Sequence, residues 1–497
     1  MIRTASDPIV IAIDAGTTGV RCAAVDTDGC IIAYRYREFT QYFPREGWVE
    51  HDADEIWEAV RSTLTQLCTA LPRPIAAIGI TNQRETIVAW DARSGRPRHR
   101  AIVWQDRRTA ATCDRLRDEG YEQLVRTRTG LVLDPYFSAT KAAWLLSDGG
   151  VTDDEHLRLG TIDTWLVWNL TGGRAHVTDV SNASRTSMYD IVNHRWDDEL
   201  CELFAVPTRA LPAVRPSSAR LGVTVAGNGL RAGIPISGVA GDQQAALFGQ
   251  ACFIPGMAKN TYGTGSFLLL NAGTRCPSPT AGMLTTVAWQ LGDDEPVYAC
   301  EGAVFVTGAA IQWMRDQLGL ITTSAEIGEL AASVPDAGGM MLVPAFTGLG
   351  SPWWDPYARG TLVGISRGCG RAQLARAVVE SIALQCRDVL DAMTAATGTA
   401  PRALRVDGGA SVMDLLLQLQ ADQLGVRVER PVIQETTALG AAFLAGLAEG
   451  VWGDTSDISR CWQLQQAFAP TPDRSVADAL HARWRQALEH SRSWATM

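Results

Sequence analysis

Asp14 and the turn that follows it, Gly16-Thr17-Thr18-Gly19, are the first residues whose types and spacing suggest chemistry. The glycines allow backbone N–H groups to point into one concavity, and the threonine hydroxyls lie beside it, an arrangement that suits phosphate. Asp14 closes an apolar strand, so its carboxylate needs a metal ion, backbone N–H groups or a cation as its partner. The stretch predicts a magnesium–nucleotide site, and a hairpin whose aspartate caps a turn accounts for it equally well.

A second turn of the same kind spans residues 261–266 and contains Gly263, Thr264 and Gly265. An apolar run precedes it and another follows it, so the pattern of strand, Gly/Thr turn and strand occurs twice as a weak internal repeat. We expect two such hairpins to face each other across a cleft and to hold a polyphosphate between them. A third turn, Gly408-Gly409, joins a predicted strand to a helix whose N-terminus favours an anion.

Arg84 and Glu85 come directly after a buried strand predicted at 75–81. On the surface, such a pair is worth less than ~1 kcal/mol. Inside a cleft, the guanidinium and the carboxylate could instead grip several hydroxyls of one small polyol. The aromatic side chains of Trp104, Tyr136 and Phe267 could then enclose its carbons, or each could pack in the core.

Asp242 stands at the expected start of a helix, in the sequence Gly241-Asp242-Gln243-Gln244. As an N-cap it would stabilise that helix by ~1 kcal/mol. As a general base it would accept a hydroxyl proton while the oxygen attacks a γ-phosphorus. The two roles are compatible.

These residues need elements that position them, and the 497-residue chain is long enough for two domains. We expect an N-terminal domain at 1–247 and a C-terminal domain at 248–497. A meander of three strands should begin at Ile9, and an amphipathic helix at 54–71 should be capped by Asp54. The other main predictions are strands at 86–90, 101–104 and 234–240 and helices at 108–118, 138–147, 303–318, 323–334, 371–396, 411–424, 436–449 and 473–494.

The composition argues against several classes of partner and site. The net charge is −10, so we expect neither nucleic acid nor an anionic membrane to bind the bulk of the surface. The eleven cysteines are scattered singly, the N-terminus lacks signal-peptide features and no apolar run approaches 18 residues, so we expect a cytoplasmic protein without a membrane span. Neither lysine, Lys141 or Lys259, follows a glycine, so the P-loop pattern is absent.

The segment from Asp14 to Arg21 resembles the first phosphate motif of the carbohydrate kinases that share the actin and hexokinase fold. Further stretches, in order, resemble the members of that family that act on glycerol. They are GWVEHD (47–52), ITNQRET (80–86), VWQDRR (103–108), DPYF (134–137), DVSNASR (179–185), GDQQAALFG (241–249), NTYGTG (260–265), PAFTGLG (344–350) and VDGGA (406–410). The resemblance implies an α/β fold of two actin-like (ribonuclease H-like) domains, with mixed sheets flanked by helices, around a central cleft.

The resemblance also implies ATP-dependent phosphorylation of glycerol to sn-glycerol 3-phosphate, with Mg2+ accompanying ATP, in a homodimer or homotetramer. Asp242 would be the catalytic base, and Asp14 and Asp242 would hold the metal. The implied glycerol-binding residues are Arg84, Glu85, Trp104, Tyr136, Asp242, Gln243 and Phe267. The implied nucleotide-binding residues are Thr17, Thr18, Gly19, Arg21, Thr264, Gly308, Gln312, Gly409 and Met413.

Three positions depart from the pattern of the family. Its glycerol-specific members usually carry Gln and Ser where this chain has Ala15 and Gly19, and Asn near the adenine where it has Met413. The phosphate cradle therefore loses one hydroxyl at Gly19, and at Met413, which offers no amide, we expect weaker or altered discrimination between nucleotide bases. A kinase for another polyol or a ketose is the nearest alternative function. A non-catalytic actin-like nucleotide-binding module is a second, and the Arg84–Glu85 pair together with Asp242 argues against it.

Overall fold

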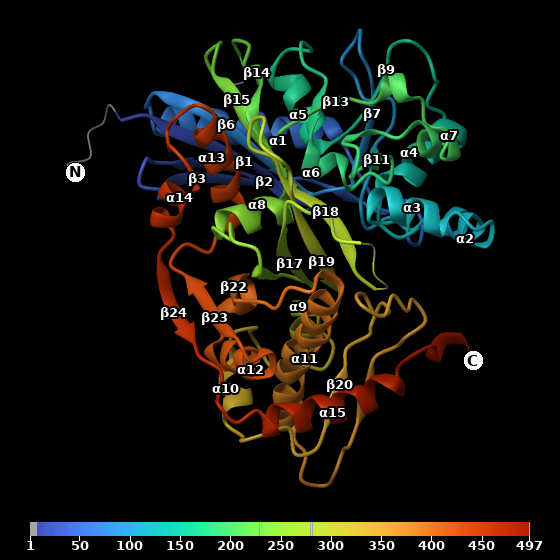
Figure 1. Ribbon diagram of the computed structural model, residues 1–497, viewed down its shortest axis with the longest axis vertical. Helices are drawn as coiled ribbons and strands as arrows, with labels where there is room; N and C mark the ends of the chain where they lie inside the picture. The colour runs from blue at the N-terminus through green and yellow to red at the C-terminus, as the bar shows by residue number, and fades with distance from the viewer. Residues whose placement is uncertain (1–6, 228, 279, 281, 497) are drawn as a thin grey trace.

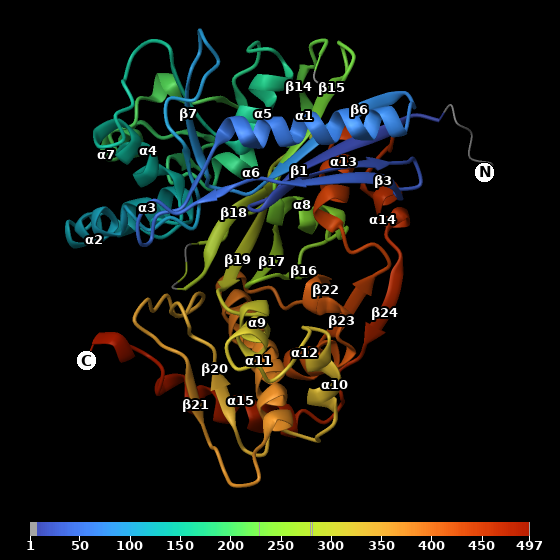
Figure 2. The ribbon, with the colours of Figure 1, turned by 180° about the vertical axis from the view of Figure 1, so that it is seen from behind.

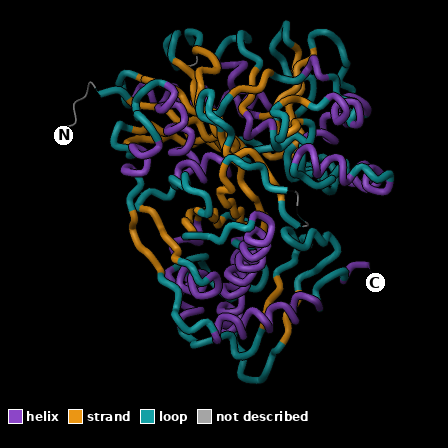
Figure 3. The backbone as a smooth tube through the Cα atoms, in the orientation of Figure 1, coloured by secondary structure: helices purple, strands orange, loops and turns teal. Residues whose placement is uncertain are grey.

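The computed structural model describes residues 7–227, 229–278, 280 and 282–496, and two large mixed sheets form its framework (Figure 1). Residues 1–6, most of the N-terminus considered above, lie outside the described residues. Strands run through the middle of the molecule with helices around them (Figure 3). None of the described helices is long and apolar enough to cross a membrane.

The first sheet begins with the predicted meander of β1 (Ile9–Ala15), β2 (Gly19–Val25) and β3 (Ile31–Glu38), which are antiparallel neighbours. Its order is β14-β15-β6-β1-β2-β3, where β6 (Ile75–Asn82) and β15 (Pro235–Gly241) run parallel to β1 and β14 (Ser218–Val223) is antiparallel to β15. Apart from half-buried Asp14, every residue of β1 is buried, because helices cover both faces of the sheet.

The second sheet repeats this plan, as the sequence pattern predicted. Its order is β18-β19-β17-β16-β22-β23-β24. Again three antiparallel strands, β16 (Met257–Tyr262), β17 (Ser266–Gly273) and β19 (Val297–Val304), are followed by two parallel ones, β22 (Ala403–Gly408) and β23 (Arg427–Pro431). The edges are β18 (Leu284–Trp289) and β24 (Leu464–Phe468). Each Gly/Thr turn therefore joins the first two strands of its own sheet.

Smaller sheets and the helices complete the fold. A third sheet has the order β4 (Gln41–Tyr42), β5 (Glu50–His51), β8 (Ala101–Ile102), β7 (Ile87–Asp91) and β9 (Leu157–Thr161). The two-stranded sheets pair β10 (Val177–Asp179) with β13 (Ala213–Arg215), β11 (Tyr189–Asp190) with β12 (Arg195–Trp196), and β20 (Met341–Val343) with β21 (Thr361–Val363). The helices are α1 (Ala53–Ala70), α2 (Ala110–Asp118), α3 (Glu122–Thr129), α4 (Ser138–Ser147), α5 (Ile162–Leu170), α6 (Val180–Ala183), α7 (Asp198–Leu203), α8 (Asp242–Gly249), α9 (Gly308–Asp316), α10 (Glu326–Ala332), α11 (Arg371–Thr397), α12 (Asp414–Leu424), α13 (Thr436–Ala448), α14 (Thr455–Cys461) and α15 (Ser475–Glu489).

Some predicted boundaries were wrong. Helix α1 is capped by Asp52, whose carboxylate accepts from the N–H groups of Asp54 and Glu55, so Asp54 is not the cap. The helix predicted at 303–318 begins only at Gly308, because residues up to Val304 belong to β19. That strand is buried on both faces, and a short buried strand cannot be told from a helix by its apolar run alone. Helices α3 and α5 were not predicted.

Helices cover the two faces of the first sheet in different ways. Helices α1 and α5 pack on one face, and α1 lies across it in the view from behind (Figure 2). The other face packs on α8 and α13, which separate it from the second sheet. These two helices cross at Gly249 and Gly440, where an added Cβ would overlap the carbonyl oxygens of Thr436 and Ala245 respectively. The close backbone approach therefore requires glycine at both positions.

We predict that Gly440→Ala lowers the free energy of unfolding by about 1–3 kcal/mol, because the added methyl group overpacks the crossing of α8 and α13. The measurement is the urea unfolding midpoint. Gly328→Ala in α10 is the control, since a Cβ there would meet only the flexible side chain of Met413 at 3.3 Å. Its higher helix propensity should leave stability unchanged or raised. Equal losses in the two variants would contradict the close-crossing argument.

Candidate functional site

The two Gly/Thr turns have matching backbone geometry. The N–H of Gly16 donates to the carbonyl of Gly19 at 3.0 Å, and the N–H of Gly263 donates to the carbonyl of Gly265 at 2.8 Å. Thr18 and Thr264 are exposed at the tips of these turns, and Thr17 is half-buried. Both turns therefore present backbone and hydroxyl groups that phosphate oxygens can reach.

Helix α9 begins against the second turn. The N–H of Gly308 donates to the carbonyl of Gly263 at 3.0 Å, and a Cβ at Gly308 would lie 2.6 Å from that oxygen. Gln312 lies one turn further along α9 and is exposed. The structure thus brings Gly308 and Thr264 together, and the N-terminus of α9 adds a favourable field for an anion.

The predicted aromatic residues meet beside the first turn. The indole N–H of Trp104 donates to the hydroxyl of Thr17 at 3.0 Å. The ring of Trp104 lies 5.6 Å from that of Tyr136 and 6.4 Å from that of Phe267, both edge to face. Because Phe267 lies on β17 next to the second turn, Trp104 stands between the two Gly/Thr turns.

Arg84 is buried in a network of ion pairs, not placed on the surface. Its guanidinium donates to both carboxylate oxygens of Glu301, at 2.5 and 3.0 Å, and to the hydroxyl of Tyr136 at 3.1 Å. Its Nε lies 3.3 Å from Asp242. Arg185 joins the network by donating to Glu85 at 2.7 Å and to Glu301 at 2.9 Å. Two buried cations therefore share three carboxylates.

Sequence reasoning missed Glu301 and gave no role to Arg185. The available signal was a lone carboxylate in the middle of the apolar strand β19, since a buried charge needs a partner. Burial alone would raise the pKa of Glu301, but the guanidinium groups of Arg185 and Arg84 hold it down at about 2. Burial raises the pKa of Glu85, and Arg84 and Arg185 oppose that rise. Glu85 also has a φ of 62°, a strained backbone for a residue other than glycine.

Asp242 is the first residue of α8 and its N-cap is Gly241, so the capping interpretation was wrong. Its carboxylate accepts from the N–H of its neighbour Gln243 at 2.7 Å. Burial raises the pKa of Asp242, whereas Arg84 and Lys259 lower it. The side chain of Asp242 therefore faces the buried ion-pair network of Arg84, and one of its oxygens accepts from the backbone of α8.

Gln243 points toward the second sheet. Its amide oxygen accepts from the ammonium of Lys259 on β16, which also donates to Thr261 at 2.9 Å. Lys259 is completely buried, and burial lowers its pKa to about 8 although Asp407 and Asp242 favour the charged form. A cation of the second sheet thus approaches the predicted base and its neighbour.

Asp14 is half-buried, and its carboxylate makes no hydrogen bond or ion pair with any described residue. Burial raises its pKa to about 7; Arg21 opposes the rise, and the like charge of Asp242 adds to it. Two carboxylates that repel each other beside a phosphate-binding turn fit Mg2+, which takes one or two carboxylates together with phosphate oxygens and water. Among the described residues, no cluster of three or more His, Cys, Asp or Glu side chains could hold a metal ion by itself.

A chain of hydrogen bonds, which the sequence did not predict, connects the first Gly/Thr turn to side chains of neighbouring segments. Gln41 donates to the carbonyl of Thr17 at 2.9 Å and accepts from His51. Gln83 donates to the carbonyl of Gly16 at 3.0 Å and to the other ring nitrogen of His51. Burial lowers the pKa of His51 to about 4, so the ring is neutral and can accept from Gln83 while it donates to Gln41. The side chains of Gln41, His51 and Gln83 therefore hold the backbone of the turn in place.

The third glycine turn lies beside the second, because Gly408 pairs with Tyr262 across the parallel strands β22 and β16. A Cβ at Gly408, whose φ is 85°, would overlap the carbonyl oxygen of Tyr262. Gly409 faces open space, since no heavy atom lies within 4 Å of where its Cβ would be. Met413, half-buried, lies against Gly328 of α10. These two predicted nucleotide residues therefore lie at the two ends of the short segment that joins β22 to α12.

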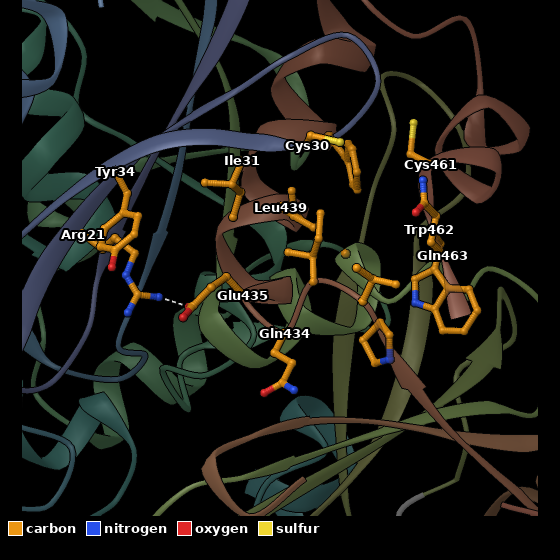
Figure 4. A pocket seen from close by; sticks show the side chains of 15 residues that line it. Arg21, Cys30, Ile31, Tyr34, Gln434, Glu435, Leu439, Cys461, Trp462 and Gln463 are labelled. Carbon is orange, nitrogen blue, oxygen red and sulfur yellow. Dashed lines mark ion pairs between the residues drawn. The ribbon is translucent and has the colours of Figure 1, made fainter. Parts of the chain in front are cut away.

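Arg21 on β2 forms an ion pair with Glu435, which directly precedes α13 (Figure 4). The pair lies at one end of a cavity of about 530 Å³ between the β2–β3 hairpin and α13. The guanidinium of Arg21 also lies over the rings of Tyr34 and Tyr36, at 5.6 and 6.0 Å from their centroids. Arg21 therefore joins the two halves of the chain at the edge of the first phosphate turn.

Comparison with known proteins gives full-length matches. Residues 9–249 match the N-terminal domain, and residues 258–449 the C-terminal domain, of the FGGY family of carbohydrate kinases. The chain is 55% identical over 496 residues to the glycerol kinase of Trichlorobacter lovleyi (98% of this chain, 99% of the relative) and 52% identical over 492 residues to glycerol kinase 2 of Thermotoga maritima (98% and 99%). The crystal structure of Plasmodium falciparum glycerol kinase with ADP superposes with a TM-score of 0.93 at 32% identity, covering 98% of both chains.

We predict that Glu301→Gln destabilises the fold by about 3–5 kcal/mol, because two buried guanidinium groups lose the carboxylate that they share. Urea unfolding measures the loss. Arg315→Gln, which breaks the exposed pair with Asp316, is the matched control and should cost less than ~1 kcal/mol. A Glu301→Gln variant as stable as the control would show that the network does not depend on this charge.

Proposed function

The chain belongs to the FGGY family of carbohydrate kinases, and we propose that its reaction is the ATP-dependent phosphorylation of glycerol to sn-glycerol 3-phosphate. The observation that carries the proposal is the identity of 49–55% with glycerol kinases over nearly the whole chain. The buried Arg84–Glu85 pair beside Asp242 supports it, because it provides both donors and acceptors for vicinal hydroxyls.

Glycerol would lie between the ion-pair network around Arg84 and the aromatic side chains of Trp104 and Phe267. The guanidinium of Arg84 donates to Glu301, Gln244 and Tyr136, so its orientation is fixed before the substrate arrives. Glu85 is held by Arg185, and the strained backbone at this residue turns its side chain into the network. Trp104 and Phe267 would flank the carbons. Such preorganisation reduces the entropic cost of orienting the acceptor.

Asp242 would accept the proton of the attacking hydroxyl. It lies 3.3 Å from Arg84, which would hold the same substrate, so the base and the acceptor oxygen would be close together. The attacking oxygen forms a bond to the γ-phosphorus as the bond to the leaving oxygen of ADP breaks, and the proton passes to the Asp242 carboxylate. Gln243 would contact glycerol only by donating from its side-chain NH2 group, since the ammonium of Lys259 donates to its amide oxygen.

The nucleotide would extend across both sheets. Backbone N–H groups and hydroxyls at Thr17, Thr18, Gly19 and Thr264 would contact the phosphates, with Arg21 from β2 and Gly308 and Gln312 from α9. Gly409 and Met413 would border the adenosine. Fixed N–H groups directed at the transferred phosphoryl group stabilise its charge without reorganisation.

We propose that Mg2+ accompanies ATP and that Asp14 and Asp242 hold it, directly or through water. When bound, the ion supplies positive charge that neutralises phosphate oxygens. The support is the raised pKa of Asp14, whose carboxylate is otherwise unpartnered among the described residues and stands near a second carboxylate.

Three further expectations remain predictions. The division into domains at 1–247 and 248–497 follows the two sheets, although α13 of the second part packs on the first sheet. Analytical ultracentrifugation can test whether the protein is a homodimer or homotetramer in solution. The expectation of a cytoplasmic protein, without nucleic acid as a partner, rests on composition and resemblance alone.

The reaction is tested by glycerol-dependent release of ADP from purified protein, which also separates glycerol from other polyols, ketoses and a non-catalytic role. We predict that Asp242→Asn lowers kcat by roughly 10²–10⁴-fold, because the variant has no base for the hydroxyl proton. Asp118→Asn on the exposed surface of α2 is the control and should keep full turnover. If Asp242→Asn turned over at the control rate, Asp242 could not be the base.

Met413→Asn tests the adenosine surface. We predict that it raises the ratio of kcat/KM for ATP to kcat/KM for GTP, because an amide can hydrogen-bond selectively to a purine edge and a thioether cannot. Steady-state kinetics with both nucleotides measures the ratio, with unaltered KM for glycerol as the internal control. An unchanged ratio would place Met413 outside the base-binding surface.

A further inference from the structure

Gly19 in the first phosphate turn is covered by a side chain from the neighbouring strand. A Cβ at Gly19 would lie 2.6 Å from the hydroxyl oxygen of Tyr36 and 2.7 Å from its ring carbon Cζ. It would also lie 2.7 Å from the carbonyl oxygen of Arg37. Because that oxygen belongs to the backbone of β3, the turn has no room for a side chain of its own at this position. The hydroxyl of Tyr36 lies where such a side chain would begin.

The strand register places this hydroxyl on the same face as the other predicted phosphate and metal residues. Asp14 pairs with Arg21, and Arg21 pairs with Tyr36, so the three form one row across β1, β2 and β3. Paired residues in adjacent strands project to the same face of a sheet. The guanidinium of Arg21 lies over the ring of Tyr36, which agrees with that register. Tyr36 therefore faces the nucleotide side of the turn.

The hydroxyl of Tyr36 is available to a ligand. Among the described residues it has no hydrogen-bond partner, and 47% of the side chain is exposed. Tyr34 provides a comparison, since it lies two residues earlier on the same strand and face, with 57% of its side chain exposed. It pairs with Ala23, further from the turn, so only Tyr36 has its hydroxyl over Gly19.

We propose that Tyr36 is a nucleotide-binding residue that donates its phenolic hydroxyl to a phosphate oxygen of ATP at the first turn. The residue supplies from β3 the side-chain donor that Gly19 cannot carry. The inference rests on the proposed function in that it takes ATP to be the ligand of this turn. A hydrogen bond to a charged oxygen is among the stronger ones that a neutral donor makes.

A purely structural role is the competing explanation, because an aromatic ring over a glycine also stabilises a pair of strands. Tyr36→Phe separates the two, since it keeps the ring over Gly19 and removes only the hydroxyl. Tyr34→Phe is the matched control on the same strand. For each variant the measurements are KM and kcat for both substrates, the affinity for ATP by calorimetric titration without glycerol, and the unfolding midpoint.

We predict that Tyr36→Phe raises the KM for ATP and weakens ATP binding by roughly 10-fold or more, while the KM for glycerol and the unfolding midpoint stay at the wild-type values. Tyr34→Phe should change none of them. Unaltered ATP binding in Tyr36→Phe, or an equal effect in Tyr34→Phe, would overturn the inference. Lack of glycerol-dependent turnover in the wild type would instead defeat the proposed reaction, and the titration would still decide the role of Tyr36.

Discussion

The buried ion pairs that Glu301 forms with Arg84 and Arg185 are the interaction on which the site depends. Arg84 follows β6 of the first sheet and Glu301 lies in β19 of the second, so the pairs join the two sheets beside Asp242. Charges removed from water are costly unless they are paired and hydrogen-bonded, and here each guanidinium has more than one carboxylate near it. The acceptor residues are consequently oriented only while the sheets remain packed together.

Small residues make that packing possible. Helices α8 and α13 lie between the sheets, and their backbones meet at glycines that leave no space for a Cβ. Asp242 is the first residue of α8. The distance between the backbones of α8 and α13 therefore determines how close its carboxylate lies to Arg84. The position of the proposed base is thus fixed by a contact at the opposite end of its own helix.

The sequence was informative where chemistry is local. Turns of glycine and threonine between apolar runs, and charged residues at strand ends, led to the two phosphate turns, to Arg84 and to Asp242. It was silent on Glu301, on the partner of Arg185 and on the chain of Gln41, His51 and Gln83. These partners are set by packing between segments 10 to more than 200 residues apart, which no local pattern encodes. For the same reason, the last two residues of β19 were predicted as the start of a helix.

The second sheet carries residues that are proposed to contact both substrates. Phe267 and Glu301 lie on β17 and β19, which are paired in register, and β17 begins directly at the turn that contains Thr264. In the proposed site, one paired element would therefore contact both substrates. If the binding of one substrate stabilises the position of this element, the binding of the other is favoured by the same free energy, since coupling between two sites is reciprocal. Under the proposed function, the affinities for glycerol and ATP would therefore be coupled through β17 and β19.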